Sequence, residues 1–397
     1  MEPLLTHCAA LDVYKATVQV CCISPDTAGN PQIQERKFPT FTQDLLALRD
    51  WLKEAQVTHV AMESTGDYWK PIYNILEGHF ELLLVNPHHV KNVPGRKTDV
   101  NDARWLAQLL QHGLIKPSFV PPAQQRALRD LTRTRTSLVE DKNRLVNRIQ
   151  KTLEDANIKL ACVASDVVGV SGQAILRALI GGQKDPQELA QLARGRMRSK
   201  LTELEAALRG YLQAHHALIL SELLCQIDSL EASIERLDEA IEGASAPFRD
   251  AVVLLDSIPG VGQTTAQVIL SEIGTDMSRF ASAAHLCAWA GVAPGNHQSA
   301  GKQHSGRTRK GNRALRRALV EAARAGVKAK ETYLQAQYYR LRSRCGSNRA
   351  IHYRTLSMTV HSLLRVKATG MCQPSLRHSS NQARPNANSE RSQRPAR

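Results

Sequence analysis

Residues 8–23 read CAALDVYKATVQVCCI and decide the fold class of the first part of the chain. Cys8 to Val13 and Thr17 to Ile23 are apolar runs rich in β-branched residues and cysteine, and Pro25 to Asn30 forms a turn cluster after them. The pattern predicts two strands of a β-hairpin. Asp12 lies inside the first strand, where an ionised side chain needs a partner or a metal ion.

Helix and strand signals alternate beyond this hairpin. Phe41 to Ala55 carries leucines at helical spacing, and Val57 to Met62 and Phe80 to Val85 are short apolar strand candidates. A further helix is expected from about Asp99 to Gly113. This alternation predicts an α/β sheet domain over residues 1–122.

The sequence changes to long helical patterns after Pro121. Residues 123–245 place leucine and isoleucine on a repeating face among charged residues, most clearly over Gln124–Asn157 and Leu201–Ile241. The pattern predicts a helical or coiled-coil arm, and it is equally typical of an ordinary helical bundle. Residues 246–350 predict a second, all-α domain.

Positive charge is concentrated at the C-terminal end of the chain. The 397 residues carry a formal net charge of +15. Residues 301–397 hold 22 Lys or Arg against 3 Glu, so residues 1–300 sum to −4. Cations set against phosphates release condensed counterions, and this asymmetry therefore favours a nucleic acid partner. Residues 351–397 are atypical and become rich in Ser, Asn, Arg and Pro after Gly370, so we predict that they are disordered.

Cysteine spacing and hydropathy exclude other classes of protein. The eight cysteines include no C-x-x-C pair and none at a zinc-binding distance from histidine, so structural zinc is not expected. No apolar run approaches the ~18 residues of a membrane span, and the N-terminus lacks a signal-like segment. We therefore expect a soluble, reduced, cytoplasmic protein with no membrane partner.

Four acids are distinguished by position. Asp12 lies in the first strand, Glu63 closes a later one, and Asp99 and Asp102 stand three apart at the start of a helix, on one face of it. Such carboxylates could hold Mg²⁺, which would activate an attacking oxygen and stabilise the leaving oxygen at a phosphodiester. Taken singly, each acid is also explained by an ion pair, a helix N-cap or solvation.

Residues 257–262, SIPGVG, precede a helical pattern from Thr264 to Ile273. This arrangement predicts a helix-hairpin-helix in which Gly260, Val261 and Gly262 bring backbone N–H groups to a DNA phosphate. A plain turn between two helices explains the same residues.

Ser299 lies in a glycine-flanked basic loop. Its hydroxyl could attack phosphorus, with His297 or His304 nearby as the base and cations holding the phosphate. The alternative is a turn residue bonded to its own backbone. The cations of this loop and the following helix that we expect to bind DNA are Lys302, Arg307, Arg309, Lys310, Arg313, Arg316 and Arg317.

The chain resembles the transposases of the insertion-sequence one-ten family, in which the acids, the hairpin and the serine loop follow one another in the same order. Asp12, Glu63, Asp99 and Asp102 match the four acids of the family's RuvC-like DEDD domain. Ile258–Arg317 is similar to its serine transposase domain, with Ser299 at the nucleophile position. The resemblance covers about residues 5–345, and the chain departs from it after about Ala350, which a shifted reading frame or a decayed gene end would explain.

The resemblance implies an RNase H-like N-terminal fold and a recombinase that excises and inserts a bacterial insertion sequence. It implies Mg²⁺ at the acids and a covalent phosphoserine link to DNA. The implied partners are the DNA of the element ends and target, an element-encoded guide RNA held by the RuvC-like domain and the arm, and further copies of the chain in a homodimer or homotetramer. The implied location is the nucleoid of the cytoplasm.

Two other functions stay open on the residues. One is a RuvC-like junction-resolving nuclease that cuts with activated water and forms no covalent link. The other is a non-enzymatic DNA-binding protein built on the hairpin and the basic helix, which leaves the four acids unexplained.

Overall fold

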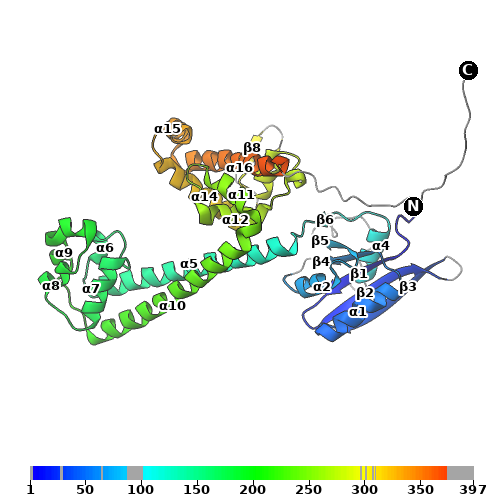
Figure 1. Ribbon diagram of the computed structural model, residues 1–397, viewed down its shortest axis with the longest axis horizontal. Helices are drawn as coiled ribbons and strands as arrows, with labels where there is room; N and C mark the ends of the chain where they lie inside the picture. The colour runs from blue at the N-terminus through cyan, green and yellow to red at the C-terminus, as the bar shows by residue number, and fades with distance from the viewer. Residues whose placement is uncertain are drawn as a thin grey trace, which may run out of the picture. The chain divides into compact units, whose positions relative to one another are not determined.

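The computed structural model divides the chain into two compact units, Met1–Pro121 and Pro122–Arg397, each with hydrophobic cores of its own (Figure 1). The structure describes residues 3–26, 30–63, 66–86, 102–295, 297–299, 302–305, 308 and 310–372. The boundary falls at the Pro-Pro pair where the sequence pattern changes.

The first unit is built on a six-stranded sheet in the order β3-β2-β1-β4-β5-β6. β1, β2 and β3 are antiparallel neighbours, β1, β4 and β5 run parallel, and β6 is antiparallel to β5. The strands are β1 Cys8–Val13, β2 Thr17–Pro25, β3 Pro31–Pro39, β4 His59–Glu63, β5 Glu81–Val85 and β6 Pro117–Ser118. The sheet confirms the predicted α/β architecture and the hairpin of β1 and β2.

β3 has no counterpart among the predicted strands. Its side chains are mostly exposed and polar, so it lacks the apolar alternation that marks a half-buried strand. Its nine residues are held at the sheet edge by a full ladder with β2. Pairing with an existing strand therefore decides its conformation.

Helices cover both faces of this sheet. Side chains from alternate positions of β1 pack with α1 (Thr42–Glu54) and α2 (Trp69–Leu76) in one core, and those from the other positions pack with α4 (Asp102–Gln111) in a second core. Cys8 and Ala10 belong to the α4 side. Asp12, two residues further along the strand, shares that face because strand side chains alternate.

The second unit begins with two long helices, α5 (Ala123–Asp155) and α10 (Ala214–Ser245), which lie side by side (Figure 1). Ion pairs along them, Arg135–Asp238 and Lys142–Glu231, show an antiparallel register. Short helices between them close a compact core at one end: α6 Leu160–Val163, α7 Val170–Ile180, α8 Pro186–Gln191, η1 Gly195–Lys200 and α9 Leu201–Ala207.

The long helix expected over Leu201–Ile241 is broken. α9 ends at Ala207 and α10 begins at Ala214. Gly210 lies in the break, where a Cβ would come 2.6 Å from the carbonyl oxygen of Ala156 and from Ile158. The chain returns here onto the end of α5, and this close approach of two backbones stops the helix.

The C-terminal part of the second unit is helical, with one small hairpin. Its elements are η2 Ala246–Phe248, α11 Arg249–Asp256, α12 Gln263–Ile273, η3 Met277–Arg279, α13 Ala283–Trp289, β7 His297–Ser299, β8 Lys302–Ser305, α14 Arg313–Lys328, α15 Tyr333–Cys345 and α16 Ser347–Cys372. The helices α11, α12, α13, α14 and α16 enclose a single core. This confirms a helical C-terminal region.

The prediction of disorder over residues 351–397 is wrong for residues 351–372, which belong to α16. Met358 and Val366 are fully buried in the same core as α11 and α14. Its apolar residues form no single stripe along the helix, and this concealed it, because the polar residues Arg354, Thr355, Thr359 and Ser362 are buried as well. Residues 373–397 lie outside the described part of the chain.

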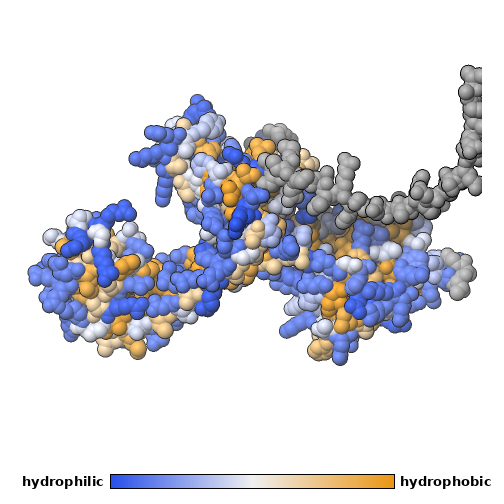
Figure 2. All heavy atoms as spheres, in the orientation of Figure 1, coloured by the Kyte–Doolittle hydropathy of each residue, from blue (hydrophilic) through white to orange (hydrophobic). Residues whose placement is uncertain are grey.

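The surfaces of both units that face the viewer are largely hydrophilic (Figure 2). Among the described residues, no helix combines the length and the apolar character that crossing a membrane requires. The apolar side chains are instead used in the cores.

Candidate functional site

Two of the predicted acids lie at the carboxyl ends of neighbouring parallel strands, Asp12 one residue before the end of β1 and Glu63 as the last residue of β4. The register of β1 and β4 pairs Leu11 with Met62, so the next residues, Asp12 and Glu63, follow each other across the strands. Asp12 and Glu63 are both half-buried. Parallel strands present their carboxyl ends at the same edge of a sheet, and the local fold therefore brings together two side chains from distant parts of the unit.

Asp102 comes to the same region from α4, of which it is the first residue. α4 packs across β1, β2 and β4. The small side chains of Cys8, Ala10 and Ala61 lie beneath it. An acid at a helix N-terminus is favoured by the helix dipole. Asp99, the remaining predicted acid, lies outside the described residues.

Tyr14 lies beside Asp12, and its pKa responds to the charges of all three acids. Its phenol donates a hydrogen bond of 2.7 Å to Asp12 Oδ2. That bond, the charge of Asp12, desolvation and the charges of Asp102 and Glu63 raise the pKa of Tyr14 to about 12. Tyr14 was not among the predicted site residues, although its place in Asp-Val-Tyr-Lys, two residues after Asp12, gave a usable signal.

A polar cavity opens beside Asp12 and Asp102, with a volume of about 520 Å³. It extends from the acids across β2 and β3, where Thr17, Gln19 and Lys37 line it. In the sheet register Asp12 is paired with Gln19, and Gln19 with Lys37. The carboxylates therefore border an open polar cavity, which leaves room for a cation and a phosphate.

A second group with metal-ligand chemistry lies in the arm, where Asp155, His215 and His216 place ligand atoms within 4.8 Å of one another. His216 Nδ1 accepts the backbone N–H of Gln213, which leaves the ring proton on Nε2, 3.0 Å from Asp155 Oδ2. A metal-bound histidine instead donates its second N–H. We therefore interpret His216 as a helix-capping residue whose Nε2–H donates a hydrogen bond to Asp155.

The turn between α11 and α12 contains the three predicted hairpin residues. Gly260 has a φ of +95°, and a Cβ there would overlap the backbone of Gly326 and Ala322 in α14. Val261 is buried, and its N–H donates to the Ile258 carbonyl at 2.9 Å. Gly262, the residue before α12, has open space around it. Gly260 and Val261 thus serve packing, whereas Gly262 is free for an approaching group.

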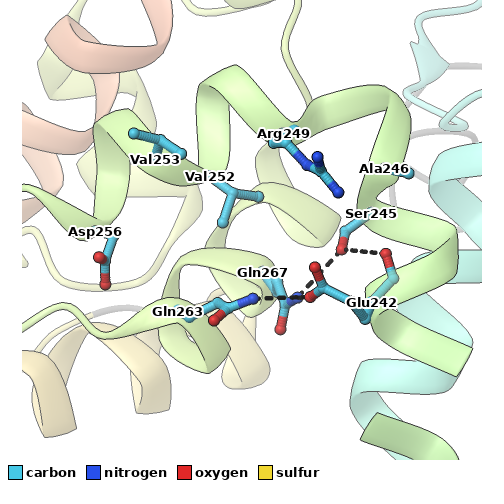
Figure 3. Close-up of a pocket in the computed structure, with 9 residues that line it drawn as sticks. All are labelled: Glu242, Ser245, Ala246, Arg249, Val252, Val253, Asp256, Gln263 and Gln267. Atoms are coloured by element: carbon cyan, nitrogen blue, oxygen red, sulfur yellow. Dashed lines mark hydrogen bonds between the residues drawn. The ribbon is translucent and has the colours of Figure 1, made fainter. Parts of the chain in front are cut away.

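A pocket of about 230 Å³ lies between α10, α11 and α12, next to this turn. Figure 3 shows Gln263 and Gln267 pointing toward Glu242, and both side-chain amides donate to Glu242 Oε2, at 2.8 and 3.0 Å. Gln267 also donates to Ser245. These bonds attach the start of α12 to the end of α10 and so set the direction of the turn.

Ser299 is the last residue of β7 and is paired with Lys302 of β8. The expected irregular loop is therefore in part a short hairpin.

Of the cations predicted to bind DNA, Lys302, Lys310 and Arg313 are exposed, and Arg316 is half-buried. Arg307 and Arg309 lie outside the described residues. Arg317, also exposed, forms an ion pair with Glu140 of α5, a contact that the sequence pattern did not reveal.

Two family models match this chain. A transposase model of the DEDD type matches residues 9–158, and the model of the transposase IS116/IS110/IS902 family matches residues 252–340. The chain belongs to the IS110 family of transposases. The two models together match more than half of the chain, and they include the acids of the first unit and the serine hairpin of the second.

Individual relatives agree with this assignment. This IS110-family transposase is 26% identical over 71% of its length to a probable family 20 transposase of Pseudomonas aeruginosa, of which the match covers 75%. It is 26% identical over 67% of its length to the transposase for insertion sequence element IS1111A of Coxiella burnetii, of which 66% is covered. It is also 26% identical over 73% of its length to the pilin gene-inverting protein of Moraxella bovis, of which 72% is covered.

Membership has two direct consequences. Transposases cleave and rejoin DNA, so the protein is an enzyme that acts on DNA. A DEDD-type domain indicates the use of a divalent metal ion. The donor set fits such an ion, because Asp12 and Asp102 offer hard carboxylate oxygens at a polar cavity, and Glu63 follows Met62, the partner of Leu11, on the strand next to Asp12.

Proposed function

We propose that this IS110-family transposase excises and inserts its element through a covalent link between DNA and Ser299, with Mg²⁺ held by the four acids. The observation that carries the proposal is that Asp12 and Asp102 line one open polar cavity, while Glu63 ends the strand next to the one that carries Asp12. Neighbouring carboxylates repel one another, and a bound cation would offset that repulsion.

The first unit is, in this proposal, RNase H-like. Support comes from its sheet, in which three antiparallel strands are followed by two parallel ones and the acids come from β1, β4 and the start of α4. Asp99, which lies outside the described residues, joins these acids in the proposal on its place in the sequence alone, three residues before Asp102.

The chemical step is a phosphoryl transfer. The Ser299 Oγ–P bond forms as the bond from phosphorus to a bridging DNA oxygen breaks, and that oxygen leaves as a DNA hydroxyl after taking up a proton. The serine proton goes to a neighbouring base, for which His297 and His304 are the candidates. Attack by a second DNA hydroxyl on the phosphoserine reverses the step and restores a phosphodiester.

Mg²⁺, when bound, would supply charge stabilisation for the developing negative charge on the phosphate and the leaving oxygen. The acids bind and orient the ion. Lys302, Lys310 and Arg313 hold DNA phosphates near the hairpin, and their exposure supports that role. Arg307, Arg309 and Arg316 join this set, and Arg317 does so if DNA replaces Glu140 as its partner.

The turn before α12 is proposed to act as a helix-hairpin-helix. The first N–H groups of a helix have no acceptor within the helix, so the start of α12 can donate to a phosphate. Open space at Gly262 supports this contact. Gly260 and Val261 shape the turn and do not bind DNA directly in this proposal.

We further propose that an element-encoded RNA pairs with donor and target DNA and is held by the first unit and the arm. A groove of about 350 Å³ between α5 and α10 supports this role, because Arg148, Gln226 and Ser229 line it together with Arg144, which is ion-paired with Asp141 of the same groove. The active enzyme is proposed to be a homodimer or homotetramer in the nucleoid of the cytoplasm, in which Ser299 of one copy completes the acidic site of another.

The serine tests the chemistry. Ser299→Ala should abolish both strand cleavage and the protein–DNA adduct, measured with end-labelled element DNA on denaturing gels and by mass spectrometry of the phosphoserine peptide. Ser305→Ala is the matched control, because Ser305 belongs to the other strand of the same hairpin and should leave the adduct intact. Cleavage that persists in Ser299→Ala would favour the water-using nuclease instead.

Terbium luminescence tests the metal site independently of DNA. Tb³⁺ replaces Mg²⁺ at carboxylates and is sensitised by nearby tyrosine, so Tyr14→Phe should remove much of the bound-ion emission. Asp12→Asn should lower the affinity for Tb³⁺ by at least about tenfold. Equal Tb³⁺ affinity in Asp12→Asn and the unaltered protein would show that the acids do not form the site.

A further inference from the structure

Glu272, near the end of α12, is a carboxylate with no solvent exposure. Arg133 of α5 binds it with both arms of its guanidinium, Nε to Oε1 at 2.7 Å and Nη2 to Oε2 at 2.9 Å. Arg129, one turn earlier in α5, lies 3.3 Å from Oε2 and donates to the Glu272 carbonyl at 2.8 Å. The negative charge is therefore compensated by the arm helix.

The same carboxylate also contacts the segment that carries Ser299. Asn312 Nδ2 donates to Glu272 Oε2 at 2.6 Å. The other polar atoms of Asn312 are used as well, because Oδ1 accepts the Leu315 N–H at 3.0 Å and caps α14, and the backbone N–H donates to the Trp289 carbonyl at 3.0 Å. Asn312 thus joins Glu272, the start of α14 and the end of α13.

The two ends of the serine-bearing segment meet at this point. A Cβ at Gly311 would overlap the backbone of Gly291, so the residues before and after the β7–β8 hairpin are in close backbone contact. Trp289 and Asn312 hydrogen-bond next to this contact. The base of the hairpin is consequently fixed to Glu272 through Asn312.

The contact of α12 with the other arm helix differs. Glu242 of α10 accepts from Gln263 and Gln267 at the start of α12, and no hydrogen bond joins it to Asn312 in the part of the chain that the structure describes. It is also exposed, whereas Glu272 is buried. The arm is therefore attached to both the start and the end of α12. Of these two contacts, the one at the end of α12 is linked further, from Glu272 through Asn312 to the base of the serine hairpin.

We propose that Glu272 is a positioning residue for the serine nucleophile, setting the base of the β7–β8 hairpin relative to α5 through Asn312. This inference rests on the proposed function, since it presupposes that Ser299 attacks DNA. A nucleophile misplaced by about 1 Å can react some 100-fold more slowly. A change in the direction of α5 would reach the hairpin through the Arg133–Glu272–Asn312 connection.

Asn312→Ser is the decisive variant, because serine is also a good N-cap but lacks the amide that donates to Glu272. At saturating DNA, the single-turnover rate of adduct formation should fall about 10- to 100-fold, while the Kd for DNA and the Tm stay close to those of the unaltered protein. Hydrogen exchange should quicken in peptides covering Trp289–Val292 and Gly311–Leu315. A purely stabilising contact would not slow the rate at an unchanged Kd and Tm.

Two further variants complete the test. Arg133→Met should slow adduct formation and quicken the same exchange, because it removes the arm side of the connection. Glu242→Ala, the matched control, breaks the other contact between the arm and α12. It acts on the proposed DNA-binding turn, so it should weaken the Kd for DNA but leave the adduct rate at saturating DNA within about twofold. If Asn312→Ser fails to fold, Arg133→Met decides the question, with the rate of adduct formation and hydrogen exchange as the two measurements.

The outcomes separate the two proposals. If the unaltered protein forms no Ser299 adduct, the proposed function fails and the positioning role fails with it. If the unaltered protein forms the adduct and Asn312→Ser forms it equally fast, the positioning role alone is overturned. Equal slowing by Glu242→Ala would also overturn it, since the effect would then come from any loosening of the arm.

Discussion

Cys8, Cys21 and Cys22 lie in β1 and β2 with no exposed surface. Desolvation is the main cause that raises the pKa of Cys8 and of Cys21 to about 12 and that of Cys22 to about 11, from 9.0. The neutral thiols therefore contribute fully to stability below pH 9, and the contribution disappears as the pH rises through the folded-state pKa values.

This burial predicts a selective labelling pattern. At about pH 8, near the ordinary thiol pKa, iodoacetamide should modify the exposed Cys162 and Cys225 in the native protein. Cys8 and Cys21 should stay intact, because both access and thiolate are lacking there. Mass mapping of peptides after a timed reaction measures each site, and labelling in urea is the control. Native labelling of Cys8 as fast as that of Cys162 would contradict the buried sheet.

Arg354 is the least favourable buried residue in the described part of the chain. Its side chain is 1% exposed, its Nε donates to the Ala323 carbonyl at 2.9 Å, and Nη1 and Nη2 have no partner there. Desolvation lowers the pKa of this guanidinium. A buried charge without a counter-charge costs stability, whereas an apolar side chain of similar length would fill the same space.

Arg354→Met should therefore stabilise the second unit by about 1 to 3 kcal/mol, measured as the free energy of unfolding in urea. Arg365→Met, at an exposed position of the same helix, is the control and should change stability by less than about 0.5 kcal/mol. A decrease in stability in Arg354→Met would mean that the guanidinium has a counter-charge in the folded protein.

At the scale of elements, the turn between α11 and α12 separates a packing glycine from a free one. Gly260 combines a φ of +95° with contact to α14, so Gly260→Ala should destabilise the protein by at least about 2 kcal/mol. Gly262 has neither restriction, so Gly262→Ala should fold normally, with a Tm within a few degrees of the unaltered protein.

DNA binding provides a second test of Gly262. If a phosphate approaches the start of α12, the methyl group of Gly262→Ala should weaken binding of short duplex DNA several-fold at constant Tm, as measured by fluorescence anisotropy. Thr264→Ala, at an exposed position of the same helix start, serves for comparison. Unchanged affinity in Gly262→Ala would show that the turn only connects two helices and does not contact DNA.

Element boundaries also show where local patterns were insufficient. The leucine spacing predicts α5 and most of α10, because each helix buries one face against the other. The break before α10 depends on the close approach of Gly210 to Ala156, which belong to segments far apart in the chain. No short window of sequence contains both.

At the scale of the whole molecule, the basic C-terminal end should govern the salt dependence of DNA binding. Beyond Cys372 the chain carries five arginines and one glutamate. A chain shortened to end at Cys372 should show a shallower slope of log K against log salt, by up to about 0.9 for each phosphate that the removed arginines neutralise. Its Tm should stay unchanged, and a slope equal to that of the full chain would exclude this end from binding.

The family and the α/β class of the first unit could be predicted from the sequence. Asp12 and Glu63 are recognisable because an ionisable acid in an apolar strand needs a partner or a metal ion, and Asp102 because it stands three residues after Asp99. The basic C-terminal end and the basic loop around Ser299 indicate a nucleic acid partner, because clustered lysine and arginine side chains bind phosphates. Period, charge and the order of motifs are properties of the chain itself, and they determined the α/β class, the long helices and the family.

Tertiary structure decided the rest. Tyr14 bonding to Asp12, the pairing that makes β3 a strand, and Glu272 shared by Arg133 and Asn312 all depend on which segments meet. Burial reversed the expectation for residues 351–372, since a helix without a clear apolar stripe can be enclosed, polar side chains included, once its neighbours form a core. The physical reason is common to these cases: the free energy of a polar group is set by the groups packed around it, and those come from distant parts of the chain.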